Sequence, residues 1–224
     1  MRIPAMARLT NGGFYAIIYP RKLICFYEDT VKKIVFVAAP PACGKNYVSE
    51  LICRNSEGIA YFDKDDLAIL LRRSFELCGE AVDMDGRFYL ENLRAAEYET
   101  LFGLAFSALR FSDLVLVNAP LLKEVRDGEF MCDLRRRARL LGAELILVWV
   151  VASREVCYER MRQRGSDRDT EKLAEWDSYV SRVDYSAPDG LVISGAIDRL
   201  FVFDNENEAA AEASLKALLG ILQS

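Results

Sequence analysis

Short apolar runs alternate with longer amphipathic segments from residue 33 to the end of the chain. Five runs are rich in valine, isoleucine and leucine and mostly apolar on both faces, as buried parallel strands are: 33–38, 58–62, 113–118, 144–151 and 199–203. The segments between them have helical composition, and the last helix is expected at about Glu208 to Leu222. Strands that alternate with helices imply right-handed crossovers. The pattern therefore predicts an α/β sandwich with helices on both faces of a doubly wound parallel sheet.

The first 30 residues follow a different pattern. Two aromatic and β-branched runs, Phe14 to Tyr19 and Leu23 to Tyr27, flank the segment Pro20-Arg-Lys22. Proline and charge between two strand-like runs predict a β-hairpin. We therefore expect a hairpin extension over residues 1–30, which covers a sheet edge, followed by one α/β domain over residues 31–224.

Polar residues follow every predicted strand. They occur in the segments Pro40 to Lys45, Asp63-Lys-Asp-Asp66, Asn118-Ala-Pro120, Ser153-Arg154 and Asp204-Asn-Glu-Asn207. In an open α/β sheet, ligands bind outside the carboxyl ends of the strands. The layout therefore predicts a functional site at this edge.

The segment Ala39 to Asn46 has the spacing of a phosphate-binding loop, with Ala39 at the position of the first glycine and Asn46 at that of the hydroxyl residue. In such a loop, backbone N–H groups and the following helix N-terminus face the phosphates, and the lysine supplies a positive charge. Here Gly44 permits close backbone approach and Lys45 is the cation. The residues predicted to bind a nucleotide are Pro41, Ala42, Cys43, Gly44, Lys45, Asn46, Tyr47, Arg160 and Asn205.

The same edge offers oxygen atoms for a metal and for proton transfer. Magnesium takes only one or two protein ligands, so Asn46 and Asn118 are predicted to hold Mg²⁺ weakly or through water. Asp63, Asp65 and Asp66 follow the second strand, where a carboxylate could accept the proton of an acceptor hydroxyl. The alternative is that these aspartates cap a helix N-terminus. Both interpretations are compatible with the sequence, because one aspartate can cap the helix while another acts in catalysis.

Arginines in the segment 154–182 form a second candidate group. Arg160 and Arg164 share a helix face, and Arg168 lies beyond the break at Gly165. Guanidinium groups match phosphate oxygens and stabilise the charge that develops during transfer. The alternative is a solvated helix whose ion-pair partners are Glu159, Asp167 and Asp169. A separate arginine run, Arg135 to Arg137 with Arg139, is expected only at the surface.

The composition of the chain limits the partners and the kinds of catalysis that we expect. The chain of 224 residues has a formal net charge of −5, which argues weakly against a nucleic-acid or anionic-membrane partner. It has no histidine, which excludes imidazole catalysis, and six cysteines without a C-x-x-C pair, which favours reduced thiols. The sequence shows no signal-peptide pattern and no apolar run long enough for a membrane span. We therefore expect a cytoplasmic protein.

With these residues identified, the sequence resembles the P-loop kinases of the nucleoside/nucleotide-kinase type, near zeta-toxin-like and chloramphenicol-phosphotransferase-like small bacterial ATP-binding proteins. The matching stretches are Pro40 to Lys45, Tyr61 to Leu67, Val117 to Pro120, Arg164 to Asp169 and Lys172 to Tyr179. The resemblance implies a five-stranded parallel sheet in the order 2-3-1-4-5, an arginine-bearing lid at about 160–170, and ATP with Mg²⁺. It also implies that Asp65 is the base, that Asp63 orients the acceptor or caps the strand end, and that Lys45, Arg164 and Arg168 assist transfer.

The expected activity is transfer of the γ-phosphate of ATP to a hydroxyl of a small molecule. Residues 64–112, a helical segment too long for a plain crossover, are expected to form part of the acceptor pocket. One alternative is a nucleotide-binding regulatory module, suggested by the amides Asn46 and Asn118. Another is a polynucleotide 5′-hydroxyl kinase, suggested by the Asp65-Asp-Leu67 pattern, although the acidic composition counts against a nucleic-acid partner. The sequence predicts no membrane partner and does not define the oligomeric state.

Overall fold

The computed structural model describes residues 6–8, 14–19, 22–27, 31–166 and 169–224. They belong to two compact units, Met1–Val31 and Lys32–Ser224. In the first unit, strands β1 (Met6–Arg8), β2 (Phe14–Tyr19) and β3 (Lys22–Tyr27) form an antiparallel sheet in the order β1-β2-β3. The strands β2 and β3 are the predicted hairpin, and β1 is a third strand that the sequence pattern did not predict.

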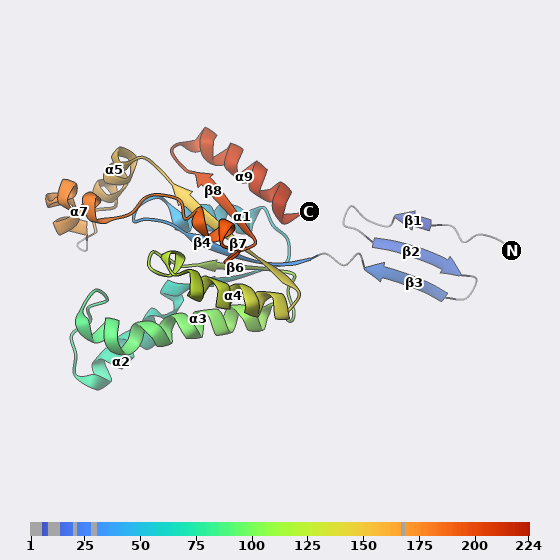
Figure 1. Ribbon diagram of the computed structural model, residues 1–224, viewed down its shortest axis with the longest axis horizontal. Coiled ribbons are helices and arrows are strands. Elements are labelled where there is room, and N and C mark those ends of the chain that lie inside the picture. Colours follow the sequence, from blue (N-terminus) through green and yellow to red (C-terminus); the bar gives the residue numbers. More distant parts are fainter. Residues whose placement is uncertain (1–5, 9–13, 20–21, 28–30, 167–168) are drawn as a thin grey trace. The chain divides into compact units, whose positions relative to one another are not determined.

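The second unit contains a five-stranded parallel sheet, shown in Figure 1. Its strands are β4 (Lys32–Ala38), β5 (Ile59–Asp63), β6 (Leu114–Asn118), β7 (Ala143–Val151) and β8 (Arg199–Asp204). The strand order is β5-β6-β4-β7-β8, and all four neighbouring pairs are parallel. This order confirms the predicted 2-3-1-4-5 topology.

Helices connect the strands and cover the sheet. The α-helices are α1 (Lys45–Arg54), α2 (Ala68–Cys78), α3 (Arg94–Ala108), α4 (Gly128–Leu140), α5 (Arg154–Arg164), α6 (Thr170–Ala174), α7 (Trp176–Arg182), α8 (Gly190–Ile193) and α9 (Glu208–Leu222). The 3₁₀ turns η1 (Lys64–Leu67) and η3 (Glu124–Arg126) and the π turn η2 (Tyr89–Leu93) lie between these helices and strands. None of the helices in the described part of the chain is both long and apolar enough to cross a bilayer.

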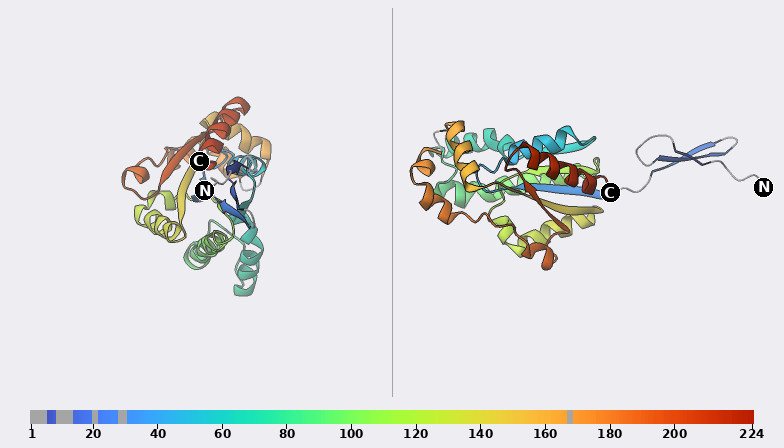
Figure 2. Two further views of the ribbon diagram at one scale, coloured as in Figure 1. Left: turned by 90° about the vertical axis from the view of Figure 1, so that its right-hand side faces the viewer. Right: turned by 90° about the horizontal axis from the view of Figure 1, so that it is seen from above.

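The central strand β4 shows why the sheet is buried on both sides. Its alternating residues Ile34 and Phe36 pack against one core, to which α3 and α4 contribute. Val35 and Val37 pack against the other core, formed with α1 and α9. Figures 1 and 2 show these helix pairs on opposite faces of the sheet. A strand buried on both faces must be apolar at every position, which explains the continuous apolar run in the sequence.

The strand register brings the site residues together. Asn118, the last residue of β6, is the Cα partner of both Val37 in β4 and Asp63 in β5. Since β4 leads directly into the loop that begins at Ala39, the register places an amide between the phosphate-binding loop and the aspartate segment.

The arginines of α4 lie at the surface as expected, with Arg136 and Arg139 exposed and Arg135 and Arg137 half-buried, but two of them also make long-range ion pairs. Arg135 Nε lies 2.7 Å from Asp198 Oδ1, and Arg139 pairs with the same carboxylate. Asp198 also accepts a hydrogen bond from the backbone N–H of Leu145, at 2.9 Å. These arginines fix the start of β8 against β7, a long-range role that the local sequence could not reveal.

Candidate active site

The loop between β4 and α1 is built for close approach of an anion. Gly44 precedes α1 with a φ of 90°, and no side chain caps the N–H groups of the first turn. Ala42 also has a positive φ, 64°. Uncapped N–H groups at a helix N-terminus are hydrogen-bond donors that favour negative charge. The local geometry therefore suits phosphate.

Two distant residues hold the loop in this shape. The backbone carbonyl of Cys43 accepts hydrogen bonds from Asn205 Nδ2 at 2.7 Å and from Arg160 Nη1 at 3.4 Å. Arg160 Nη2 also donates to the backbone carbonyl of Asn205, at 2.8 Å. Arg160 and Asn205 were predicted to bind the nucleotide, and the structure places both against the loop backbone. Among the other predicted residues, Tyr47 is exposed, and Pro41 and Ala42 are half-buried.

Lys45 is held by two amide side chains. Its Nζ donates to Asn118 Oδ1 at 2.7 Å and to Asn46 Oδ1 at 2.9 Å. Burial lowers the pKa of Lys45 below its usual value, and the nearby carboxylates of Asp63 and Asp65 oppose this effect. A phosphate group would supply the strong negative partner that this ammonium group lacks.

Asn118 lies at the centre of the polar network. It is fully buried, and its Oδ1 also accepts a hydrogen bond from the buried Ser49 Oγ at 3.1 Å. Its Nδ2 donates to Asp63 Oδ2 at 2.5 Å and to Asn46 Oδ1 at 3.1 Å. The amide oxygens of Asn46 and Asn118 therefore already accept hydrogen bonds, and either must give up a donor before it can bind a metal ion.

Asp63 is a capping residue. Its Oδ1 accepts the backbone N–H of Asp65 at 2.9 Å, and its Oδ2 accepts the Tyr61 hydroxyl at 2.6 Å. Burial by itself raises the pKa of Asp63, but hydrogen bonds from Tyr61, Asp65 and Asn118, together with Lys45, outweigh it and lower the pKa. A carboxylate so well supplied with donors is a poor proton acceptor. The geometry thus favours the capping interpretation for Asp63.

Asp65 differs from Asp63 in its surroundings. It lies in η1, its side chain is exposed, and its carboxylate has no hydrogen-bond or ion-pair partner among the described residues. Its charge nonetheless acts on Lys45. Of these two aspartates, Asp65 therefore has the carboxylate available for proton transfer.

The predicted arginines do not converge on one group. Arg164 donates from Nε and Nη2 to Asp169 Oδ2, at 2.9 and 2.5 Å, whereas Arg160 binds the loop. Asp169 was one of the ion-pair partners expected for a charged helix. Arg168 lies outside the described residues.

The segment after β5 carries a second polar network. Lys64 Nζ lies 2.8 Å from Glu97 Oε1 on α3, and the hydroxyl of Tyr89 donates to the same carboxylate. Arg94 Nη2 lies 2.5 Å from Glu124 Oε1, and its guanidinium lies 4.6 Å from the ring of Tyr98. These contacts join η1 and α3, which belong to the segment 64–112 expected to form part of the acceptor pocket, to η3, which lies beyond that segment.

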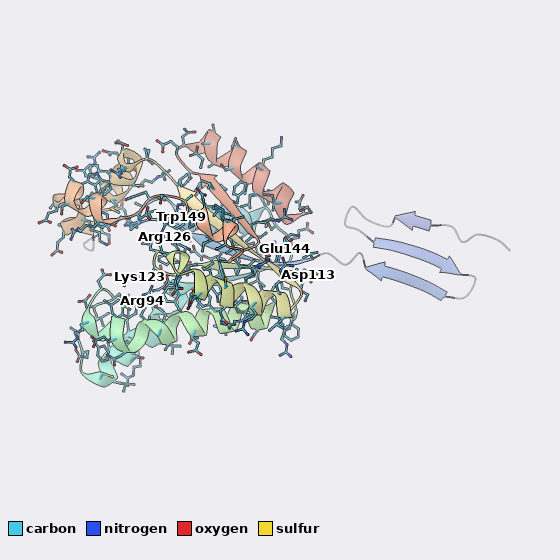
Figure 3. The ribbon with its side chains drawn as sticks, viewed as in Figure 1. Arg94, Asp113, Lys123, Arg126, Glu144 and Trp149 are labelled. Carbon is cyan, nitrogen blue, oxygen red and sulfur yellow. The ribbon has the colours of Figure 1, made fainter. Side chains whose placement is uncertain are left out.

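Basic residues continue this network along the carboxyl edge of the sheet. Figure 3 shows Arg94, Lys123 and Arg126 at one end of the sheet, and Asp113 and Glu144 at the other. Arg126 Nη2 lies 3.0 Å from Asp184 Oδ2. The side-chain ammonium group of Lys123 has no ion-pair or hydrogen-bond partner in the described part of the chain. It is the cation of this group that remains available to a ligand.

Sequence reasoning missed Tyr61 and Ser49. Tyr61 lies two residues before Asp63 in β5, so strand periodicity puts the two side chains on the same face. Ser49 lies four residues after Lys45 in α1, so helical periodicity places the two on one face. Both periodicities can be recognised in the sequence, but their importance for the site depends on the position of the partner strand β6.

A family model described as AAA domain matches residues 34–185. A comparison with curated proteins gave no match.

Solved structures resemble the chain over most of its length. A protein of Chloroflexus aurantiacus described as a candidate kinase has a TM-score of 0.57 and 20% identity, covering 88% of this chain and 98% of its own. A sugar kinase from a Janibacter species has a TM-score of 0.54 and 14% identity, covering 85% and 94%. The tunicamycin resistance protein of Deinococcus radiodurans has a TM-score of 0.50 and 12% identity, covering 84% and 96%. At these identities the likeness shows the fold, which is of the P-loop kinase type.

Proposed function

We propose that this chain, which belongs to the AAA domain family matched over residues 34–185, is an ATP-dependent kinase that transfers the γ-phosphate to a hydroxyl of a small molecule. The observation that carries the proposal is the arrangement of Lys45 and Asp65. Lys45 is held at the phosphate-binding loop by two amides, and Asp65 presents an unpaired carboxylate whose charge reaches it. Phosphoryl transfer needs such a cation for the phosphates and a carboxylate for the acceptor.

Magnesium would accompany the nucleotide. No group of three or more cysteine or carboxylate side chains in the described ranges could hold a metal ion. Phosphate oxygens and water would therefore supply most of the six ligands, with Asn46 or Asn118 completing the set. This donor set fits Mg²⁺, which usually keeps several waters.

Different residues would have different roles in phosphoryl transfer. The N-terminus of α1 and Lys45 bind the phosphates, and Asp65 accepts the proton of the acceptor hydroxyl as its oxygen attacks phosphorus. Asp63 stays ionised and fixes η1 through its bond to the N–H of Asp65. Arg164 is paired with Asp169, so its predicted role requires that this ion pair be released.

The acceptor would lie against η1, α3 and η3. In the network around Glu97 and Glu124, the buried Oε2 of Glu124 has no hydrogen-bond partner, and Lys123 provides an unpaired side-chain cation. A polar small molecule fits such surroundings better than an apolar one, because buried polar groups need partners. We expect no membrane or nucleic-acid partner.

Incubation with ATP, Mg²⁺ and a panel of small hydroxyl compounds tests the proposal. ADP release should depend on the acceptor, and Asp65→Asn should lower its rate about 100- to 10,000-fold, the range for loss of a general base. Asp66→Asn, a neighbouring exposed aspartate on the same 3₁₀ turn, is the matched control and should retain activity. Equal rates for Asp65→Asn and the unmodified protein would refute Asp65 as the base.

A second candidate is a nucleotide-binding regulator without phosphotransfer. The observation in its favour is that Asn46 occupies the position where a hydroxyl residue is expected, and that the side-chain oxygens of Asn46 and Asn118 both already accept hydrogen bonds from Lys45. Calorimetry distinguishes the two candidates. Tight ATP binding that is unchanged by removal of Mg²⁺, together with no turnover on any acceptor, would favour the regulator.

A further inference from the structure

Two buried thiols meet directly beneath the phosphate-binding loop. The Sγ atoms of Cys43 in the loop and Cys157 in α5 lie 3.5 Å apart. Both residues are 0% exposed and belong to the core on the α1 and α9 side of the sheet. Both are free thiols. Residues 114 positions apart in the sequence thus come within reach of a covalent bond.

A disulfide between these residues requires only a small movement. The S–S bond is about 2.05 Å long, so the sulfur atoms must approach by about 1.5 Å. The movement would act directly on the loop, because the carbonyl of Cys43 is the group that Asn205 and Arg160 hold. A packed interior does not absorb such a shift without rearranging its neighbours.

The surroundings favour a reactive pair. The hydrogen bond from Cys43 lowers the pKa of the Cys157 thiol; burial opposes this effect, and Arg160 adds to it. The same hydrogen bond is the main cause that raises the pKa of Cys43, and burial is the second cause. Of the two thiols, Cys157 therefore loses its proton more readily, and the thiolate is the form that attacks oxidants.

We propose that Cys43 and Cys157 form an oxidative modification site, at which a small hydroperoxide converts the thiol pair to a disulfide and displaces the phosphate-binding loop. In the balanced reaction, the Cys157 thiolate attacks the terminal oxygen of the hydroperoxide and breaks the O–O bond, which gives a sulfenic acid and an alcohol, or water when the oxidant is hydrogen peroxide. The Cys43 sulfur then attacks the sulfenic sulfur and forms the S–S bond as the S–O bond breaks, and the oxygen leaves as water; the two thiol protons complete these products. Two electrons pass from the thiols to the peroxide.

Access to the buried thiols comes from opening of the loop. Ala42 is a residue with a Cβ held at a φ of 64°, a conformation that L-residues avoid. The carbonyl of Cys43 is anchored by the side chains of Asn205 and Arg160, so opening must break these two hydrogen bonds and expose the buried Cys43 side chain. Local opening of this kind, without global unfolding, would give the oxidant access to the thiols.

The consequence for ligand binding rests on the proposed function. Displacement of the Cys43 carbonyl also moves Gly44, whose conformation sets the N-terminus of α1. Loss of one charge-assisted hydrogen bond to phosphate lowers affinity about tenfold or more. We expect the oxidised protein to bind ATP at least that much more weakly, and dithiothreitol to restore the affinity.

The test uses the full chain, reduced and then treated with hydrogen peroxide. Remaining thiols are blocked with N-ethylmaleimide, and peptides are mapped by mass spectrometry without reduction. The expected product is a cross-linked peptide pair containing Cys43 and Cys157, which dithiothreitol separates. Both thiols still alkylated after treatment that oxidises the exposed Cys78 and Cys132 would overturn the proposal.

Two variants and one binding measurement complete the test. Cys157→Ser keeps a small hydrogen-bonding side chain beside Cys43 and should abolish the cross-link, whereas Cys132→Ser should leave it intact. A cross-linked protein with unchanged ATP affinity would overturn the loop displacement. Failure of the reduced protein to bind ATP would instead refute the proposed function, while the peptide map would still decide whether the pair forms a disulfide.

Discussion

Gly44→Ala tests the geometry of the phosphate-binding loop. Gly44 has a φ of +90°, and a Cβ atom built there lies 2.2 Å from Asn205 Nδ2. Real Cβ atoms do not approach a neighbour so closely, so Asn205 must move. Asn205 is 2% exposed and donates to the carbonyl of Cys43, and its displacement therefore breaks a buried hydrogen bond.

The expected loss of stability has two parts. Holding an L-residue in the left-handed region costs about 1–2 kcal/mol. Leaving a buried donor or acceptor without its partner costs about 1–3 kcal/mol more. Gly44→Ala should therefore lower the free energy of unfolding by about 2–5 kcal/mol. Gly58→Ala is the matched control, because Gly58 has a φ of +68° and nothing within 4 Å of the added Cβ.

Urea unfolding of both variants measures the difference, and calorimetry with ATP measures the effect on the site. Gly58→Ala should show only the backbone penalty and bind ATP normally. The double variant Gly44→Ala/Asn205→Ala removes the clashing amide and should recover part of the loss attributed to the clash. An unfolding free energy for Gly44→Ala equal to that of Gly58→Ala would refute the argument from close packing.

Further predictions concern the carboxylates and the choice of partner. Tyr61→Phe removes the O–H that donates to Asp63 and should destabilise the protein by about 1 kcal/mol at pH 7. Since the pKa of Asp63 is lowered in the fold, its contribution is complete at neutral pH and is lost as the pH falls below 3.8, where urea unfolding should show the two proteins converging. Asp198→Asn removes a carboxylate that is 4% exposed and should cost about 2–4 kcal/mol in urea unfolding, against less than about 1 kcal/mol for Asp133→Asn at an exposed pair. Single-stranded oligonucleotides should fail to bind in a low-salt fluorescence-anisotropy titration, and tight binding there would favour a polynucleotide substrate.

The sequence was sufficient to predict the sheet because strands buried on both faces are visible in the sequence as continuous apolar runs. Each predicted strand agrees with the observed strand to within one residue at either end, from 33–38 against Lys32–Ala38 to 199–203 against Arg199–Asp204. The site layout followed from the same pattern, since parallel strands bring their carboxyl ends to one edge.

Contacts between distant segments produce no comparable pattern in the sequence. The bonds from Arg160 and Asn205 to the Cys43 carbonyl span 117 and 162 residues. Local periodicity correctly placed Arg160 and Arg164 on one helix face, but their partners depend on how α5 packs against the loop. The difference between Asp63 as a cap and Asp65 as a free carboxylate likewise depended on Tyr61 and Asn118, which only the folded sheet brings together.

The amide at position 118 is chemically matched to its neighbours. Asn118 accepts a hydrogen bond from Lys45 through its oxygen and donates one to Asp63 through its nitrogen. A carboxylate there could accept from Lys45 but could not donate to Asp63, and it would place two negative charges in contact. Asp63 in turn is held in place by Tyr61 and by the N–H of Asp65. The asparagine thus allows the cap and the lysine to share one buried polar network, and the exposed carboxylates of Asp65 and Asp66 in η1 lie outside it.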